Sequence, residues 1–298
     1  MTLLVETRSA TRRFGTLTAV DAVDIAVVPG EVVGLLGANG AGKTTLIRLL
    51  LGLLRPTSGS VALFGSPPSL ATRARVGYVP QTLGLYDDLS VEENWRFAAA
   101  AFHQAGLPLP ASVSVWRETL VGALPLGVQR HVAFTVALAH RPELMVLDEP
   151  TSGVGPLAGA RLWEQIRAEA DRGAGVLVTT HNMEEAEQCD RLVVMVDGSV
   201  IARGTVAEIV SDQTVTEVRC AQWQQAFSLL ENRGFVVQLH GAALRVTGPA
   251  HAVASLLSTA DIRADVDEVA ANLEEAFVGM ATTEIGQGSA PPPVPGAR

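Results

Sequence analysis

The chain of 298 residues contains very little lysine, cysteine or aromatic side chain. Lys43 is the only lysine among the 22 lysine and arginine residues, and the formal net charge is −9. A chain with this charge balance has no broad basic field, so nucleic acid is not an expected partner. Two cysteines, Cys189 and Cys220, do not make a disulfide framework or a metal site, and we predict ordinary thiols in a reducing compartment.

Long hydrophobic runs are also missing from the sequence. No apolar run approaches the roughly 18 residues that a membrane span needs. The longest candidates, such as 144–147 and 192–196, have the length of buried strands. An acid and three arginines interrupt the N-terminal stretch by Arg13, which is not typical of a signal peptide. We therefore expect a soluble cytoplasmic chain that reaches a membrane only through a partner.

The residues that are present indicate a phosphate-binding loop at Gly37–Thr45. Its sequence, GANGAGKTT, fits the pattern G-x-x-x-x-G-K-[ST] and lies between a strand-like run at 31–36 and a helix-like run at 46–54. Glycines let backbone N–H groups approach phosphate oxygens, and the positive end of the helix faces the same anion. The predicted nucleotide-binding residues are Gly37, Asn39, Gly40, Ala41, Gly42, Lys43, Thr44 and Thr45.

The sole lysine belongs to this loop, although arginine is used everywhere else. A small ammonium group fits a phosphate cradle where a planar guanidinium does not. We expect Lys43 to contact the β- and γ-phosphates of a nucleoside triphosphate and the Thr44 hydroxyl to ligate Mg²⁺.

Strand-like and helix-like runs alternate along most of the chain. This alternation predicts an α/β fold with a mostly parallel sheet, interrupted by a helical subdomain at about 86–140. The composition changes near 210–213, and the pattern beyond it predicts a small α+β domain, for which a ferredoxin-like arrangement is a candidate. We expect domains at 1–211 and 212–282, followed by a disordered tail at 283–298.

Two segments fit the capping box that opens helices. They are 90–93 and 182–185, each with an acid three residues after a capping side chain. The second box predicts a short helix whose acids form a solvated face: Glu184, Glu185 and Glu187.

Polar residues end three further strand-like runs. Asp148 and Glu149 follow an apolar run, and His181 and Gln81 each close another. Parallel strands present such residues at one edge of the sheet, where ligands bind. There Asp148 would hold Mg²⁺ through water, and Glu149 would polarise the attacking water as a general base. His181 would reach the γ-phosphate and Gln81 would join Mg²⁺ and the water, although either one taken alone is more simply explained as an ordinary polar strand end.

Together and in this order, these motifs resemble the ATP-binding cassette (ABC) transporter ATPases. The resemblance covers roughly residues 3–210 and implies a P-loop NTPase fold of the ABC type, with a mostly parallel sheet, antiparallel strands and an inserted helical subdomain. The segments 78–81, 85–94 and 179–186 are most similar to exporters of drugs, lipids or polysaccharides. The adenine-stacking aromatic of the family falls on Phe14, with Val20 beside the ribose or base; an ordinary packed turn residue is the alternative for Phe14.

Two motifs depart from the family pattern. The signature loop, L-S-G-G-[QM] in the family, falls on Leu124–Val128. There Pro125 removes a hydroxyl and an N–H donor, and Leu126 adds bulk where the backbone must approach the nucleotide closely. Gly155 replaces an aspartate that crosses the dimer interface. Both motifs act chiefly on the nucleotide of the opposite subunit, while the residues of this chain's own site are intact.

The resemblance implies an ATPase subunit that powers a membrane ABC exporter with ATP and Mg²⁺. Its partners would be integral-membrane permease subunits, which would hold it at the inner face of the plasma membrane. The two departures favour a heterodimer with a second ATPase whose signature is intact. The alternatives are a non-catalytic, nucleotide-sensing regulatory subunit, a soluble ABC protein outside transport, and tolerated variation at Pro125 and Leu126.

Overall fold

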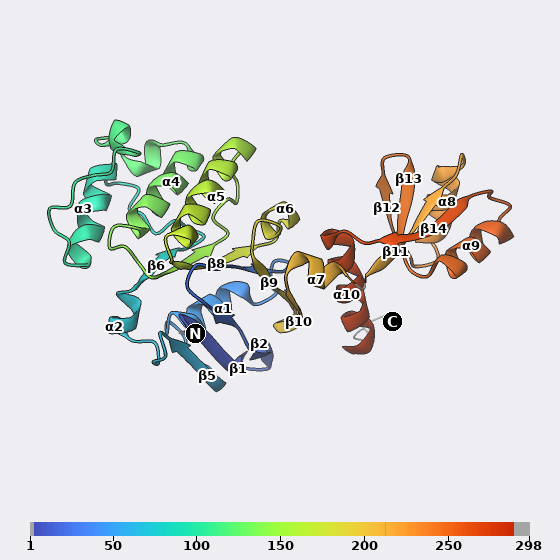
Figure 1. The fold of residues 1–298 in the computed structure, drawn as a ribbon, viewed down its shortest axis with the longest axis horizontal. Coiled ribbons are helices and arrows are strands. Elements are labelled where there is room, and N and C mark those ends of the chain that lie inside the picture. The colour runs from blue at the N-terminus through green and yellow to red at the C-terminus, as the bar shows by residue number, and fades with distance from the viewer. Residues whose placement is uncertain (1–2, 212, 289–298) are drawn as a thin grey trace, which may run out of the picture. The chain divides into compact units, whose positions relative to one another are not determined.

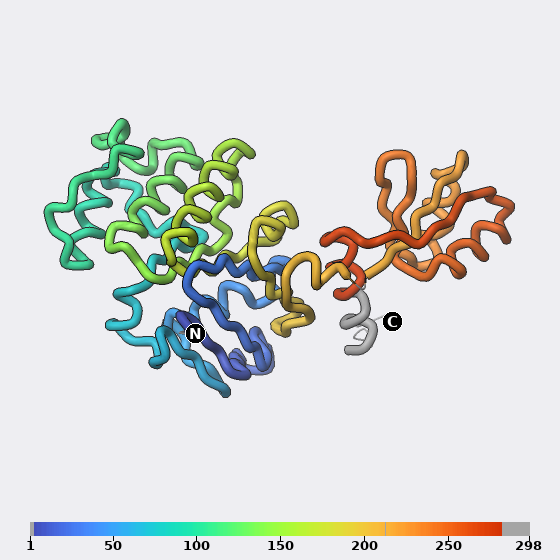
Figure 2. Tube along the Cα trace, viewed as in Figure 1, coloured from blue at the N-terminus to red at the C-terminus, as the bar shows by residue number. Residues whose placement is uncertain are grey.

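The computed structural model describes residues 3–211 and 213–288, which divide into two compact units at Arg203/Gly204 (Figures 1 and 2). The helices and strands of the first unit are β1 (Val5–Phe14), β2 (Leu17–Val23), β3 (Ala26–Val27), β4 (Val32–Leu36), α1 (Lys43–Leu50), β5 (Ser58–Leu63), α2 (Leu70–Arg73), β6 (Val76–Val79), α3 (Val91–Ala101), α4 (Leu126–Ala137), β7 (Leu144–Asp148), α5 (Pro156–Asp171), β8 (Gly175–Thr180), α6 (Met183–Ala186), β9 (Arg191–Val196) and β10 (Ser199–Gly204). In the described ranges, no helix has both the length and the apolar content to cross a lipid bilayer.

The first unit contains a six-stranded sheet and a four-stranded sheet. The larger sheet has the order β10-β9-β4-β8-β7-β6, and β4 pairs in parallel with β8 and β9, as β7 does with β6 and β8. Every residue of β4, β7 and β8 is buried, which explains why these strands are continuous apolar runs. In the smaller sheet, β1 pairs antiparallel with β2, β3 and β5. The predicted mixture of a mostly parallel sheet and antiparallel strands is confirmed.

Helix α1 lies between the two sheets (Figure 1). Its buried residues recur at helical spacing, so opposite sides of the helix can pack on both sheets. They share one core with Val33 and Leu35 of β4 and with Val5 and Ala10 of β1; the residues concerned are Leu46, Ile47, Leu49 and Leu50. This packing fixes the start of α1, and therefore the end of the loop that precedes it.

The inserted helical subdomain has a small core of its own. Helix α3 begins at the predicted capping box, because the Ser90 hydroxyl accepts from the Glu93 N–H and the Glu93 carboxylate accepts from the Ser90 N–H. Two short 3₁₀ turns, Ser114–Trp116 and Val121–Ala123, connect α3 to α4. The buried core consists of Val91, Val113, Val121, Leu124 and Val132.

The second unit has the βαββαβ order of a ferredoxin-like domain. Its elements are α7 (Val206–Val210), β11 (Thr214–Arg219), α8 (Trp223–Glu231), β12 (Val236–His240), β13 (Ala243–Thr247), α9 (Ala250–Thr259), β14 (Asp265–Ala270) and α10 (Leu273–Gly288). The antiparallel sheet has the order β12-β13-β11-β14, and residues of α8 and α9 share a buried core with it. The ferredoxin-like arrangement considered from the sequence is therefore the observed one.

The limits of the second unit differ from the expected 212–282. The unit begins at Gly204 because Val210 of α7 packs against a cluster that contains Ala276 of α10. Helix α10 continues to Gly288, so 283–288, expected to be part of a disordered tail, are helical. No glycine or proline interrupts the sequence between Met280 and Gly286. The rest of that predicted tail, 289–298, lies outside the described residues.

Candidate active site

The loop between β4 and α1 is shaped by glycines that no larger residue can replace. Gly42, the N-cap of α1, has φ +98°, and a Cβ there would lie 2.3 Å from the carbonyl oxygen of Ala19. A Cβ at Gly37 would lie 2.5 Å from the carbonyl oxygen of Met195. No side chain that the structure describes caps the first turn of α1, and no acid lies in that turn. Its N–H groups are therefore suited to an anion.

The remaining residues of the loop lie at its surface or directly behind it. Asn39 and Gly40 are exposed, Ala41 is buried, and Thr45 is partly buried in the first turn of α1. The backbone between β4 and α1 is thus the outer wall of the site, and Ala41 packs into the core behind it.

Lys43 is curled into this loop. Its Nζ donates to the carbonyl oxygens of Gly37 at 2.6 Å and Ala38 at 3.1 Å. It lies 3.8 Å from Oε1 of Glu149, and the residue is only 5% exposed. Burial lowers the pKa of Lys43, while the charges of Glu149 and Asp148 oppose that shift. The ammonium group is thus placed where an anion entering the loop would meet it.

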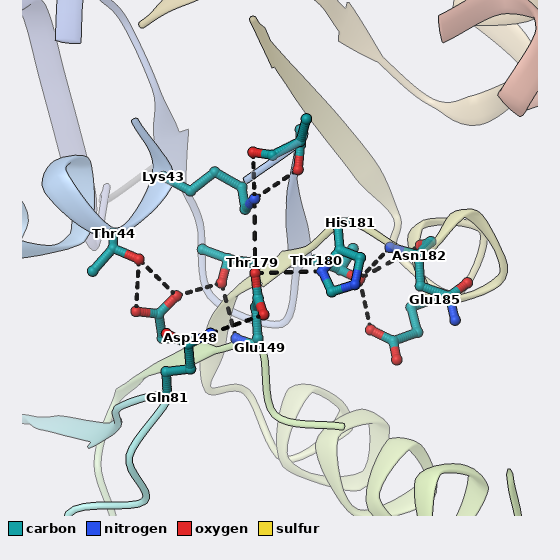
Figure 3. Close-up of polar contacts among 12 residues, drawn as sticks. Lys43, Thr44, Gln81, Asp148, Glu149, Thr179, Thr180, His181, Asn182 and Glu185 are labelled. Carbon is teal, nitrogen blue, oxygen red and sulfur yellow. Dashed lines mark hydrogen bonds and ion pairs between the residues drawn. The ribbon is translucent and has the colours of Figure 1, made fainter. Parts of the chain in front are cut away.

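Asp148, at the end of β7, faces Thr44 in the first turn of α1 (Figure 3). The Thr44 hydroxyl donates to Oδ2 of Asp148 at 3.1 Å, and the Thr179 hydroxyl donates to Oδ1 at 2.7 Å. Hydroxyl and carboxylate oxygens are the donors that Mg²⁺ prefers, and such sites often use one or two protein oxygens together with substrate phosphates. The donor set at Thr44 and Asp148 fits Mg²⁺. Gln81 lies nearby but binds Glu149 instead of Asp148.

Glu149 is held on all sides in a backbone conformation that is rare for its type. Its φ is +49°, its N–H donates to the Thr179 hydroxyl at 2.9 Å, and its carbonyl oxygen accepts from Arg130 Nη1 at 3.0 Å. The side chain meets Gln81 Nε2 at 3.2 Å through Oε2 and His181 Nδ1 at 3.4 Å through Oε1. Strained residues of this kind cluster at functional sites, where the surrounding contacts stabilise them.

The structure therefore brings three of the predicted residues around one carboxylate and a fourth to the acid beside it. Lys43, Gln81 and His181 all contact Glu149, and Thr44 reaches the adjacent Asp148 (Figure 3). Glu149 is buried, whereas Gln81 and His181 are exposed. Two acids, a lysine, a histidine and an amide at one sheet edge are the groups required to bind a triphosphate and activate a water molecule.

Phe14 and Val20 lie in the hairpin beside the loop, but only one of them is accessible. Phe14 ends β1 before the turn at Gly15, is 43% exposed, and has the Arg12 guanidinium 4.6 Å from its ring centroid. Val20 has 0% exposure and belongs to the core around α1. The expected contact between Val20 and a ribose or base is not available here, because this side chain packs into the core that α1 shares with the strands.

The altered signature segment, Leu124–Val128, still leads into a helix, α4. Pro125 is the N-cap of α4, without a capping side chain, and the helix begins at Leu126 as a proline at this position allows. Leu126 is 41% exposed and lies over the segment that contains the second departure. A Cβ added at Gly153 would meet Cδ2 of Leu126 at 3.0 Å. The two altered motifs are therefore neighbours in space.

Glu185 corrects a prediction made from the sequence. It was expected in a capping box and on a solvated face, but Asn182 accepts from the Glu184 N–H and Glu185 does not reach back to Asn182. The Glu185 carboxylate accepts hydrogen bonds from the hydroxyls of Thr180, at 2.7 Å, and Thr151. The reason is that α6 follows β8 so closely that this side chain lies under the sheet edge.

Sequence reasoning also missed Thr179 and Arg130. Thr179 is completely buried, and its hydroxyl joins Asp148 to the backbone of Glu149. Burial lowers the pKa of the Arg130 guanidinium, and the nearby carboxylates of Glu149 and Glu185 oppose that shift. A signal was present for the threonines, because polar residues at the end of an otherwise apolar strand must find buried partners.

Comparisons with known proteins agree with this geometry. A family profile described as "ABC transporter" matches residues 20–152. The chain is 40% identical over 227 residues to the Nod factor export ATP-binding protein I of Burkholderia lata, covering 72% of this chain and 75% of that protein. It is 37% identical over 236 residues to the probable multidrug ABC transporter ATP-binding protein YbhF of Escherichia coli, covering 75% of this chain but 41% of YbhF. A solved structure of an ATP-binding subunit of an ABC transporter superimposes with a TM-score of 0.63 at 30% identity, over 70% of this chain and 92% of that one.

Proposed function

The chain belongs to the ABC transporter family of ATP-binding proteins, and from that premise we propose that it binds and hydrolyses ATP to power a membrane exporter. The observation that supports this most directly is the group of Lys43, Gln81 and His181 around the Glu149 carboxylate. The names of the relatives, a multidrug transporter and a Nod factor exporter, support export as the direction of transport. Permease subunits would hold the chain at the inner face of the plasma membrane.

Binding of ATP requires Lys43 to change partners. In the structure its ammonium group donates to two carbonyl oxygens of its own loop, Gly37 and Ala38. Phosphate oxygens carry more negative charge than carbonyls, so they would replace these contacts and draw Nζ toward the β- and γ-phosphates. The N–H groups at the start of α1 would complete the anion cradle. Phe14 would stack on the adenine, as its exposed ring permits.

Hydrolysis is an attack of water on the γ-phosphorus. Glu149 would accept a proton from the water as the new oxygen–phosphorus bond forms and the bond to the bridging oxygen of ADP breaks. Gln81 and His181, which already contact the Glu149 carboxylate, would orient the water and meet the γ-phosphate. Mg²⁺ held by Thr44 and Asp148 would supply positive charge against the phosphate oxygens.

An asymmetric pair of ATPase subunits accounts for the altered motifs. A serine hydroxyl and glycine N–H groups at the start of α4 would serve the nucleotide of a partner, but this chain has Pro125 and Leu126 there. Leu126 also lies against Gly153, in the segment that contains Gly155, so the two departures are neighbours in space. A partner with an intact signature would complete the nucleotide site of this chain. The partner's nucleotide site would in turn receive the altered signature of this chain. A homodimer would have two poor sites.

The test is ATP turnover of the purified chain alone, compared with turnover after addition of the partner ATPase and permeases. We expect low turnover alone and a rise of about 10-fold or more with the partner, abolished by Glu149→Gln, which removes the base while keeping its size. Fast turnover by the isolated chain that Glu149→Gln leaves unchanged would refute the proposal.

A variant with the family's signature residues restored shows whether Pro125 and Leu126 impair the partner's nucleotide site or are tolerated variation. The double variant Pro125→Ser/Leu126→Gly returns the hydroxyl and the open backbone, and we expect it to raise hydrolysis at the partner's nucleotide site. That site is isolated in a background in which Glu149→Gln silences the site of this chain. The exposed Leu157→Gly is a control for loss of a surface leucine near the same helix pair. No gain in the double variant would mean that this segment is functional as it stands.

A non-catalytic, nucleotide-sensing subunit is the second candidate, and the altered Leu124–Val128 segment favours it. The two candidates differ in one measurement. A sensing subunit would bind ATP and change transport, yet Glu149→Gln would leave total turnover of the complex unchanged.

A further inference from the structure

Glu185 lies outside the phosphate loop and the groups that meet ATP, yet it contacts both segments that carry the reacting side chains. Its Oε2 accepts from the Thr180 hydroxyl at 2.7 Å, and its Oε1 accepts from the Thr151 hydroxyl. Thr180 is the residue before His181, and Thr151 is two residues after Glu149. One carboxylate therefore joins the end of β8 to the segment that follows β7.

The Thr180 hydroxyl extends this link across His181. It donates to Glu185 and accepts from the N–H of Asn182 at 2.9 Å, so both neighbours of His181 are fixed by a single oxygen (Figure 3). The Asn182 side chain in turn caps α6, the helix that carries Glu185. His181 itself is half exposed and has its ring 3.4 Å from Glu149. Its position is thus set by the backbone on either side.

These contacts form a closed ring. From Glu149 it passes along the chain to Thr151, through hydrogen bonds to Glu185 and Thr180, along the chain to His181, and back to Glu149 through Nδ1 and Oε1. A ring of this kind restrains the separation of the two reacting side chains, because the hydrogen bonds of Thr151 and Thr180 to Glu185 tie together the segments that carry them. Glu149 needs such support, since its backbone has the strained φ of +49°.

A carboxylate suits this position. Two hydroxyl donors converge on Glu185, and a carboxylate offers two acceptor oxygens and no donor. The buried guanidinium of Arg130 lies close enough for its charge to interact with Glu185 and Glu149, and it donates to the carbonyl oxygen of Glu149. The negative charge is therefore compensated without a direct bond that would draw it away from the threonines.

We propose that Glu185 is a positioning residue that holds His181 and Glu149 at their working separation through Thr180 and Thr151. The inference rests on the proposed function, because it assigns Glu185 to the hydrolysis step carried out by those two side chains. Within the part of the chain that the structure describes, the Glu185 carboxylate bonds to Thr151 and Thr180 and not to Lys43, Thr44 or the loop Gly37–Gly42, so it would act on the rate of hydrolysis and not on the affinity for ATP.

The experiment measures kcat and KM for ATP in the complex with the partner ATPase and permeases. Glu185→Ala leaves both threonine hydroxyls without their acceptor, and we expect kcat to fall about 10- to 100-fold with KM changed less than about 2-fold. Glu187→Ala removes an exposed acid two residues along the chain and should leave both constants unchanged. Glu185→Gln keeps an acceptor for Thr180 and a donor for Thr151, and should recover most of the rate.

A double-mutant cycle shows whether Glu185 acts through His181. In a His181→Ala background, Glu185→Ala should lower kcat less than about 2-fold further, because the residue it positions is gone. Thr180→Val, which removes the linking hydroxyl and keeps the shape, should reproduce the loss and serves if Glu185→Ala does not fold. Equal losses in both backgrounds, or a rise in KM with kcat unchanged, would overturn the inference.

Failure of this inference is distinguishable from failure of the proposed function. If Glu149→Gln abolishes turnover but neither Glu185→Ala nor Thr180→Val lowers it, the chain hydrolyses ATP and Glu185 has no positioning role. If Glu149→Gln has no effect on turnover, the proposed function is wrong, and the role of Glu185, which depends on it, is wrong as well.

Discussion

Replacement of Thr179 by valine should destabilise the first unit far more than the removal of a hydroxyl from an exposed side chain would. The side chain is completely buried at the end of β8. Its hydroxyl donates to Oδ1 of Asp148 at 2.7 Å and accepts from the N–H of Glu149 at 2.9 Å. Valine has nearly the same shape but neither donates nor accepts, so Thr179→Val changes the hydrogen bonds and leaves the packing intact.

The magnitude follows from the two lost bonds. A hydrogen bond to a charged group contributes about 1.5–3 kcal/mol, and a buried N–H left unpaired costs about 1–3 kcal/mol. The methyl group that replaces the hydroxyl returns at most about 1 kcal/mol. We therefore expect the free energy of unfolding to fall by about 2–5 kcal/mol. A unit of this size loses about 2–4 °C of Tm for each kcal/mol, which gives a shift of about 4–20 °C.

Scanning calorimetry of the whole chain measures this shift in the transition of the first unit. Thr179→Ser is the matched control, since it keeps the hydroxyl and loses only a methyl group, at a cost of about 1 kcal/mol. We expect the valine variant to melt well below the serine variant and to lose ATP turnover, because the strained Glu149 backbone loses one of its partners. If valine is as stable as serine, the two hydrogen bonds do not support the site and the reasoning fails.

Four further predictions concern the loop and the thiols. An amine-selective reagent should label Lys43 and the N-terminus alone, and saturating ATP should protect Lys43; equal labelling with and without ATP would mean that the loop does not bind phosphate. Gly42→Ala should weaken ATP binding more than about 10-fold, measured by calorimetric titration, since its Cβ would lie 2.3 Å from a carbonyl oxygen, whereas Gly155→Ala, with nothing within 4 Å, should bind normally. Burial raises the pKa of Cys189 to about 12, so a thiol reagent at pH 8 should modify Cys220 first, and rapid labelling of Cys189 in the folded chain would contradict its burial. Because the pKa of Cys189 is raised on folding, its contribution to stability should fall as the pH rises above the unfolded value of about 9.

Several parts of the site follow from local sequence alone. The loop Gly37–Thr45 requires glycine for close backbone contact and a lysine for charge, and both residue types occur within one short segment of sequence. Asp148 and Glu149 come directly after a run of apolar residues, so their place at a sheet edge follows from the parallel sheet. The alternation of strands and helices also predicted the architecture of the first unit, since burial of its parallel strands on both faces leaves continuous apolar runs.

Other parts depend on which segments meet in space. Val20 is apolar and lies near the expected adenine site in sequence, but it packs in the core with residues of α1. The limit of the second unit depends on packing between Val210 and α10, more than sixty residues later in the chain, and no local pattern records it. The proximity of Leu126 to Gly153 is also a consequence of tertiary structure.

The sequence by itself determined the chemistry of this protein: a triphosphate loop with one lysine, two acids at a strand end, and a family pattern broken at Pro125 and Gly155. Each of these is a short run of residues with its own physical requirement. Tertiary structure decided how the reacting groups are held, because a hydroxyl or carboxylate can bind many partners and only the fold chooses among them. Glu185 is the clearest case: its place on a short helix predicts a solvated acid, and the meeting of two strand ends makes it the acceptor for Thr151 and Thr180.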